Sequence, residues 1–136
     1  MKPLTTVQQR KLEKAARSAA KVSYSPYSKF RVGAAVLTES GKIFAGTNVE
    51  NASYSLCNCA ERTAIFTAIT AGEQLVRAVA VYTPTKLAHA PCGSCRQVIN
   101  EFGPESRVIS ICDSADHIDT VLSALLPGAF GPENLA

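Results

Sequence analysis

Apolar residues near the amino terminus recur at the spacing of one face of a helix. The run opens at residues 6–9, which fit a capping box that begins with Thr6, and it stops before Ser25-Pro26. Polar and charged side chains separate the apolar positions, which are Leu12, Ala15, Ala16, Ala19 and Val22. The pattern predicts an amphipathic helix on the outside of a larger core.

Two apolar runs then flank a short polar segment, in the pattern of a β-hairpin. Residues 30–37 and 43–48 form the runs, and residues 39–42 contain the glycine that a tight turn favours. We therefore expect an antiparallel pair of strands to open a sheet.

Helical and strand-like patterns alternate in the rest of the chain. We expect helices at residues 59–71, 92–102 and 117–126, and strands at residues 75–82 and 107–112. Gly72, Gly103-Pro104 and Pro127-Gly128 supply the helix stops. The order of the elements predicts an α/β fold of three layers, with helices on both faces of a mixed sheet.

Length, composition and charge narrow the class of protein. A chain of 136 residues with 46% hydrophobic side chains is long enough for one core, so we expect a single domain over residues 1–136. The net charge of +3 comes from scattered lysines and arginines, many of them on the first predicted helix, as on a solvated helix face. We therefore expect no nucleic-acid partner.

The amino terminus lacks the apolar core of a signal peptide, and no apolar run approaches the length of a membrane span. We therefore expect a cytoplasmic protein with no membrane partner. Five cysteines, an odd number, do not suit a disulfide framework in a reducing compartment, so metal binding or catalysis is the better interpretation.

Three of these cysteines and one glutamate form the most informative pattern in the chain. Cys59 and Glu61 make a C-x-E segment and Cys92 and Cys95 a C-x-x-C segment, each at the start of a predicted helix. The unpaired N–H groups there stabilise thiolates. Three thiolates leave one zinc position open for water, as a hydrolytic site requires, whereas a closed structural site needs a fourth ligand.

Each half of this pattern also has a plainer interpretation. The C-x-x-C pair alone fits a redox pair or half of a structural zinc knuckle, and an acidic residue such as Glu61 is common in a first helical turn. A redox protein and a non-catalytic, zinc-stabilised interaction module therefore remain open. Together, however, the two segments match the zinc ligands and the acid/base glutamate of nucleobase deaminases.

Five blocks of the sequence resemble cytidine deaminases of the small, homotetrameric class. The blocks extend over nearly the whole chain, and none departs from the family pattern at a motif position. They are residues 24–35 (YSPYSKFRVGAA), 46–52 (GTNVENA), 59–62 (CAER), 91–97 (PCGSCRQ) and 125–130 (LLPGAF). Within the same fold, a deaminase for another substrate, such as a nucleoside antibiotic or an RNA base, is the alternative.

The resemblance implies a three-layer α/β/α fold with a mixed sheet of the five-stranded type. It also implies a zinc-dependent hydrolase of pyrimidine salvage that converts cytidine and 2′-deoxycytidine to the uridine forms and ammonia. Cys59, Cys92 and Cys95 would hold one zinc ion per subunit, zinc-bound hydroxide would attack C4, and Glu61 would be the proton shuttle.

The resemblance further implies which residues contact the nucleoside. Asn48 and Glu50 would hold the ribose hydroxyls, Phe30 would pack on the base, and the Ala60 backbone would meet the pyrimidine. Val49, Tyr54 and Phe130 complete the implied substrate-binding set, and Tyr54 and Phe130 resemble residues that reach into a neighbouring subunit's site. A place in the protein's own core is the rival interpretation for Phe30 and Phe130.

Five further residues carry weaker expectations. Three thiolates on one divalent cation leave a net negative cluster, which Arg62 can offset through hydrogen bonds to the ligand sulfurs. His89 would close the site if it were a fourth ligand, so we expect it to be solvated. We expect Cys57 and Cys112 to be small buried residues, and His117 to begin the last helix without a chemical role.

Overall fold

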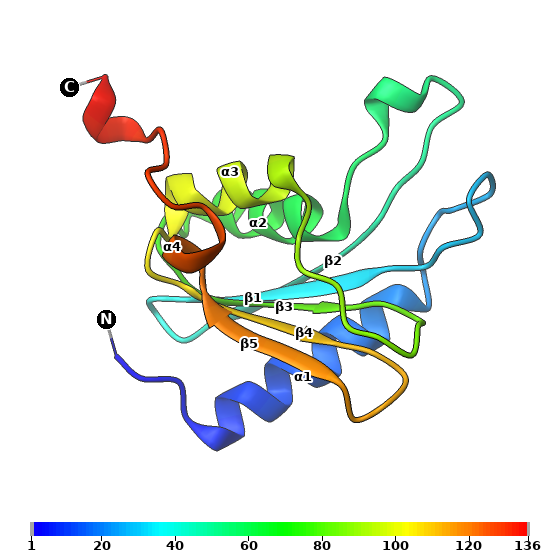
Figure 1. The fold of residues 1–136 in the computed structure, drawn as a ribbon, viewed down its shortest axis with the longest axis horizontal. Coiled ribbons are helices and arrows are strands. Elements are labelled where there is room, and N and C mark those ends of the chain that lie inside the picture. Colours follow the sequence, from blue (N-terminus) through cyan, green and yellow to red (C-terminus); the bar gives the residue numbers. More distant parts are fainter. Residues whose placement is uncertain (1, 136) are drawn as a thin grey trace.

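The structure, a computed structural model that describes residues 2–135, has a five-stranded mixed sheet as its middle layer (Figure 1). The strands β3 and β4 are parallel, and all other neighbours are antiparallel. This confirms the predicted α/β class. Across the sheet the order is β2 (Ile43–Thr47), β1 (Gly33–Thr38), β3 (Val76–Tyr82), β4 (Arg107–Ile111) and β5 (His117–Val121).

Helices cover both faces of the sheet, as predicted. Helix α1 (Thr6–Ala20) lies on one face, and α2 (Ala60–Thr70), α3 (Gly93–Phe102) and the short α4 (Leu122–Leu125) lie on the other (Figure 1). Single 3₁₀ turns at Tyr54–Leu56 and Pro132–Asn134 complete the described elements. Among residues 2–135, every helix is too short or too polar to span a lipid bilayer.

Helix α1 begins and ends earlier than its sequence pattern predicts. The capping residue is Thr5, not Thr6: its hydroxyl accepts a hydrogen bond from the Gln8 N–H, and the Gln8 side chain accepts one from the Thr5 N–H, both at 3.1 Å. The helix ends at Ala20, so Val22 lies beyond it and is 74% exposed rather than buried.

The predicted helix at residues 117–126 is wrong. His117 begins the strand β5, which pairs with β4, and only Leu122–Leu125 are helical. Ile118 and Thr120 are partly buried while their neighbours are exposed, which is the alternation of an edge strand with one face on the core. Hydrogen bonds to β4 satisfy the backbone groups on the inner side of β5, and a local sequence pattern does not reveal that partner strand.

Two apolar clusters hold the layers together, one on each face of the sheet. Alternate residues of the fully buried β1 contribute to both: Val36 packs with α2 and α3, and Leu37 packs with α1. Gly46 of β2 allows α2 to lie close to the sheet, because a Cβ atom there would be 2.3 Å from the Ala64 nitrogen. This close packing fixes where the amino terminus of α2 lies.

Candidate metal centre

The three predicted cysteine ligands come from the amino termini of two helices that lie side by side. Cys59 is the N-cap residue of α2, Cys92 is the N-cap residue of α3, and Cys95 lies in the first turn of α3. Both N-cap residues have extended backbones, and neither side chain caps its own helix. Their thiols are therefore free to turn toward each other.

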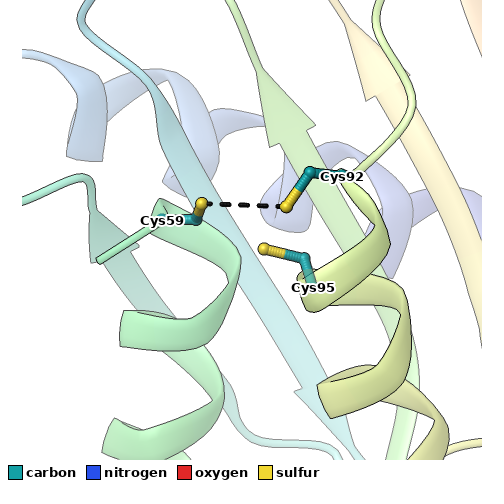
Figure 2. A group of neighbouring side chains, drawn as sticks. All are labelled: Cys59, Cys92 and Cys95. Carbon is teal, nitrogen blue, oxygen red and sulfur yellow. Dashed lines mark hydrogen bonds between the residues drawn. The ribbon is translucent and has the colours of Figure 1, made fainter. Parts of the chain in front are cut away.

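The sulfur atoms of Cys59, Cys92 and Cys95 point at a common centre (Figure 2). All three lie within 4.8 Å of one another, and the Cys59 and Cys92 sulfurs are 3.9 Å apart. Tetrahedral zinc with bonds of about 2.3 Å to sulfur places its sulfur ligands roughly 3.8 Å apart. The residues therefore fit a zinc ion in both donor type and spacing.

Arg62 lies beside this cluster, where the sequence predicted a contact with the ligands. Its Nη2 atom donates a hydrogen bond to the Cys59 sulfur at 3.4 Å. Its Nε atom is buried and has no partner among the described residues. A guanidinium held against thiolates offsets part of their negative charge.

Hydrogen bonding sets the acidity of the thiols. The pKa of Cys59 is lowered to about 5, because the Cys95 thiol donates a hydrogen bond to it and Arg62 lies beside it. The pKa of Cys95 is raised, first because its proton is shared with the Cys59 thiolate and second because it is buried. Of these two thiols, Cys59 is therefore the more acidic.

Glu61 is the buried carboxyl group next to the cluster. It lies in the first turn of α2 and is only 5% exposed. Burial raises its pKa to about 7, and the neighbouring Cys59 charge adds to this. A carboxyl group with such a pKa both takes up and releases protons near neutral pH.

A cavity of about 340 Å³ opens over the cluster and contains most of the predicted site residues. Cys59, Glu61 and Cys92 lie along it with Ala60, the first residue of α2. The cavity therefore connects the metal cluster and the buried carboxyl group with residues just beyond β2 and in the loop before β1. The predicted residues from these segments that line it are Phe30, Asn48 and Glu50.

Asn48 lies just beyond β2 and braces the segment that carries Phe30. Its side-chain nitrogen donates to the Phe30 carbonyl at 2.8 Å, and its side-chain oxygen accepts from the Val32 N–H at 3.0 Å. The Ser23 hydroxyl also donates to that oxygen. The amide therefore fixes the loop before β1 against the wall of the cavity.

Glu50 is held as a carboxylate by the loop opposite. Its carboxylate accepts hydrogen bonds from the Tyr27 N–H at 3.0 Å, the Ser28 N–H at 3.1 Å and the Ser28 hydroxyl. These bonds, the Ser28 hydroxyl foremost, keep the pKa of Glu50 below its ordinary value. The cavity thus has the charged carboxylate of Glu50 at one end and the buried carboxyl group of Glu61, which can be protonated near neutral pH, beside the metal cluster.

Three residues of the predicted substrate-binding set do not line this cavity. Val49 is 42% exposed, and its backbone is paired with Asn58. Tyr54 and Phe130 are 72% and 58% exposed, so the chain's own core covers neither ring. Their contacts with substrate stay predictions.

Several residues that line the cavity were not predicted from the sequence to belong to the site. Cys57, expected to be a buried small residue, is instead half-buried and lines the cavity, whereas Cys112 is buried as expected. His89 is exposed and lies along the cavity wall. Cys57 and His89 reach the cavity because of the way the loops fold over the sheet, which local sequence patterns do not predict. The one local sign of a place in the site is that Cys57 stands two residues before Cys59. The other unpredicted lining residues are Ser28, Val32, Asn58, Val81, Thr83 and Ala90.

Comparison with known proteins identifies a family for this arrangement. Residues 6–111 match the family model described as the cytidine and deoxycytidylate deaminase zinc-binding region. The chain is 46% identical over 127 residues, 93% of both chains, to a cytidine deaminase of Sporosarcina psychrophila. A crystal structure of cytidine deaminase from Burkholderia pseudomallei is 49% identical, with a TM-score of 0.85 over 89% of this chain and 98% of that chain. A cytidine deaminase structure from Mycobacterium tuberculosis is 36% identical, with a TM-score of 0.75 over 90% of this chain and 97% of that chain.

Proposed function

The chain belongs to the family of cytidine and deoxycytidylate deaminases, and from this membership we propose that it hydrolyses cytidine and 2′-deoxycytidine to the corresponding uridines and ammonia. The observation that carries the proposal is a cluster of three cysteine sulfurs, two of whose residues, Cys59 and Cys92, line one cavity together with the buried carboxyl group of Glu61. A redox pair does not need Glu61, and a closed structural zinc site does not need a cavity over the metal.

Zinc is the cofactor, one ion per subunit, held by Cys59, Cys92 and Cys95. When bound, it acts as a Lewis acid that lowers the pKa of water at the position that the three thiolates leave open. Arg62 supports the ligand set by its hydrogen bond to Cys59.

Glu61 moves the protons of the reaction. It takes the proton that the attacking water loses and delivers it to N3 of the pyrimidine while the C4–O bond forms. It then takes the proton of the new C4 hydroxyl and gives it to the amino nitrogen, so that the C4–N bond breaks and ammonia leaves. The pKa of about 7 that burial gives Glu61 suits a group that acts first as base and then as acid.

The nucleoside lies along the cavity with its base toward Glu61. Phe30 packs on the base, and the Ala60 N–H, which has no acceptor within the first turn of α2, donates to the pyrimidine. Asn48 and Glu50 hold the ribose hydroxyls at the other end. Val49 belongs to the same substrate-binding set that the family resemblance implies.

A homotetramer completes the site. The exposed aromatic rings of Tyr54 and Phe130 support this assembly, because large apolar groups without cover on their own chain commonly pack against a partner. In the tetramer these two residues contact the nucleoside of a neighbouring subunit.

The protein's setting is part of the same proposal. Residues 1–136 form a single catalytic domain that acts on small nucleosides in the cytoplasm, in pyrimidine salvage, with no nucleic-acid or membrane partner. The five cysteines, all free of disulfides in the structure, are consistent with a reducing compartment.

Substitution Glu61→Gln tests the assignment directly. We expect the variant to bind zinc as the unaltered protein does and to lose roughly 10²–10⁴-fold in turnover, because general acid–base catalysis contributes about that much. The decrease in cytidine absorbance measures turnover, and metal analysis measures zinc. Loss of zinc from the variant would make Glu61 a ligand, and unchanged turnover would exclude it as the proton shuttle.

A further inference from the structure

A second, cationic hollow lies on the opposite face of the sheet from the metal centre. It has a volume of about 430 Å³, and three positively charged side chains, Arg17, Lys21 and Arg31, line it. Ala20, Tyr82 and Pro84 form the remainder of its lining. None of the lining residues is acidic.

Strand alternation separates this hollow from the catalytic cavity. Tyr82 packs on the side of α1, whereas its neighbours Val81 and Thr83 line the cavity over the metal cluster. Helix α1 and helices α2 and α3 also lie on opposite faces of the sheet (Figure 1). The hollow is therefore a distinct site and not an extension of the nucleoside cavity.

Neutral acceptors hold the two arginines of the hollow in place. The Nη2 atom of Arg17 donates to the Cys112 carbonyl at 3.1 Å, and its guanidinium lies 4.9 Å from the centre of the Tyr82 ring. The Nη1 atom of Arg31 donates a hydrogen bond to the Lys21 carbonyl at 3.0 Å. Lys21 is the C-cap residue of α1, so this bond also satisfies a carbonyl at the carboxyl end of the helix. Each guanidinium keeps further N–H groups for a ligand.

No acidic side chain lines the hollow, although Arg17 also lines a neighbouring hollow together with Glu13, Asp116 and Asp119. Within residues 2–135 the structure forms one ion pair, between Arg107 and Asp119, which lies elsewhere. Asp113 does not line the hollow, but it accepts a hydrogen bond at 2.5 Å from the hydroxyl of Tyr82, which does. Three cations that are partly pre-positioned and unpaired make a site for an anion of several charges.

We propose that this hollow binds an oligophosphate, either inorganic or carried by a nucleotide. Arginine forks match phosphate oxygens geometrically, and three cations suit a chain of phosphates better than a single one. The volume falls in the range of small-molecule sites. The apolar lining of Ala20 and Pro84 offers a surface for a nucleoside attached to the chain.

Calorimetric titration of the zinc-loaded protein with tripolyphosphate, in magnesium-free buffer, tests the proposal. We expect saturable binding of one tripolyphosphate per chain, which weakens as salt is added, and at least tenfold weaker binding of orthophosphate. Adenosine triphosphate, which lacks a cytosine ring, distinguishes the sources. Equal affinity with tripolyphosphate supports recognition of the phosphate chain alone, and tighter binding supports a nucleotide ligand.

A pair of double variants locates the site. Lys21→Gln with Arg31→Gln should weaken tripolyphosphate binding at least tenfold, whereas Lys11→Gln with Lys42→Gln removes the same charge outside the hollow and should change it less than twofold. Cytidine turnover after titration shows that each protein is folded and has kept its zinc. Absence of saturable binding, equal losses in both variants, or equal binding of orthophosphate would overturn the proposal.

Discussion

The two glutamates of the catalytic cavity have opposite protonation behaviour, and the difference comes from their surroundings. Burial raises the pKa of Glu61 to about 7, whereas the Ser28 hydroxyl and two backbone N–H groups lower the pKa of Glu50. One carboxyl group is thereby suited to carry protons and the other to accept hydrogen bonds from a sugar. Neither property follows from the residue type alone.

The pH dependence of substrate binding should report the charge of Glu50. Because its pKa lies below the ordinary value of 4.5, the carboxylate stays charged as pH falls from 7 to 5, and Glu50 itself should cause no change in the KM for cytidine over this range. In Ser28→Ala the main cause of the low pKa is gone, so protonation begins at higher pH. We expect KM in this variant to rise severalfold on acidification before it rises in the unaltered protein.

The control for this prediction is Ser40→Ala, which removes an equivalent hydroxyl from Glu73, outside the cavity. KM is measured only over the pH range in which metal analysis finds full zinc content. Identical pH profiles for Ser28→Ala and the unaltered protein would show that the charge of Glu50 does not hold the ribose.

The catalytic cluster depends on secondary-structure elements that are set by local sequence. Helices α2 and α3 each begin at a cysteine, and close packing of α2 on Gly46 brings its first turn next to that of α3. Arg77 of β3 likewise holds a segment in place, in this case the amino-terminal residues that lead into α1. Its Nη2 atom donates to the carbonyls of Lys2 and Pro3, at 3.0 and 2.9 Å, and it is 7% exposed.

Substitution Arg77→Met should therefore loosen the segment that leads into α1. The variant leaves two carbonyl acceptors without their donor, which costs about 1–3 kcal/mol in the free energy of unfolding. Urea unfolding at a fixed protein concentration measures the loss, with the exposed Arg10→Met as the control. A variant as stable as the control would show that Arg77 does not anchor the amino-terminal segment.

The sequence correctly predicted those helices and strands whose apolar spacing and flanking turn residues lie within or next to the element itself. The hairpin, α2, β3 and α3 fall within one or two residues of their expected bounds, except that β1 begins three residues later than expected. The strand β5 was missed because its five residues also fit a helical pattern, and only pairing with β4 decides between the two. Thr5 was missed as the N-cap because Thr6 offers the same hydroxyl one position later.

The same division holds within the catalytic site. Cys59, Glu61, Cys92 and Cys95 are close in sequence within their motifs, so spacing and family resemblance were enough to select them. Cys57 reaches the cavity through a loop whose path depends on the assembled sheet, and its position two residues before Cys59 is too weak a signal to distinguish it from a core cysteine.

At the scale of the whole molecule, the carboxyl-terminal segment holds the Phe130 backbone against α3 and leaves the Phe130 ring exposed. The Phe130 carbonyl accepts hydrogen bonds from Gln97 at 2.8 Å and from Asn100 at 3.3 Å, so α3 holds this backbone. The ring itself is 58% exposed. A fixed backbone with an uncovered ring is consistent with a ring that serves a neighbouring subunit.

Subunit mixing tests this arrangement. Phe130→Ala should raise the KM for cytidine, and Glu61→Gln should be nearly inactive. In the proposed tetramer, a Glu61→Gln subunit would supply Phe130 to the intact cavity of a Phe130→Ala subunit, so activity per Phe130→Ala chain should rise severalfold on mixing. Sedimentation should also give about four times the chain mass of 14.4 kDa.

The matched control mixes Phe130→Ala with a chain that carries both Phe130→Ala and Glu61→Gln. This partner has no Phe130 to donate, so no gain is expected. Equal activities in the two mixtures would mean that Phe130 acts within its own subunit or not at all.

X-ray absorption at the zinc edge of the purified protein tests the central feature of the site most directly. We expect three sulfur neighbours at about 2.3 Å and one oxygen neighbour at about 2.0–2.2 Å, the oxygen belonging to water. That result establishes a zinc ion with a position left for the reaction. Four sulfur neighbours, a nitrogen neighbour from the protein, or a preparation without zinc would contradict the account.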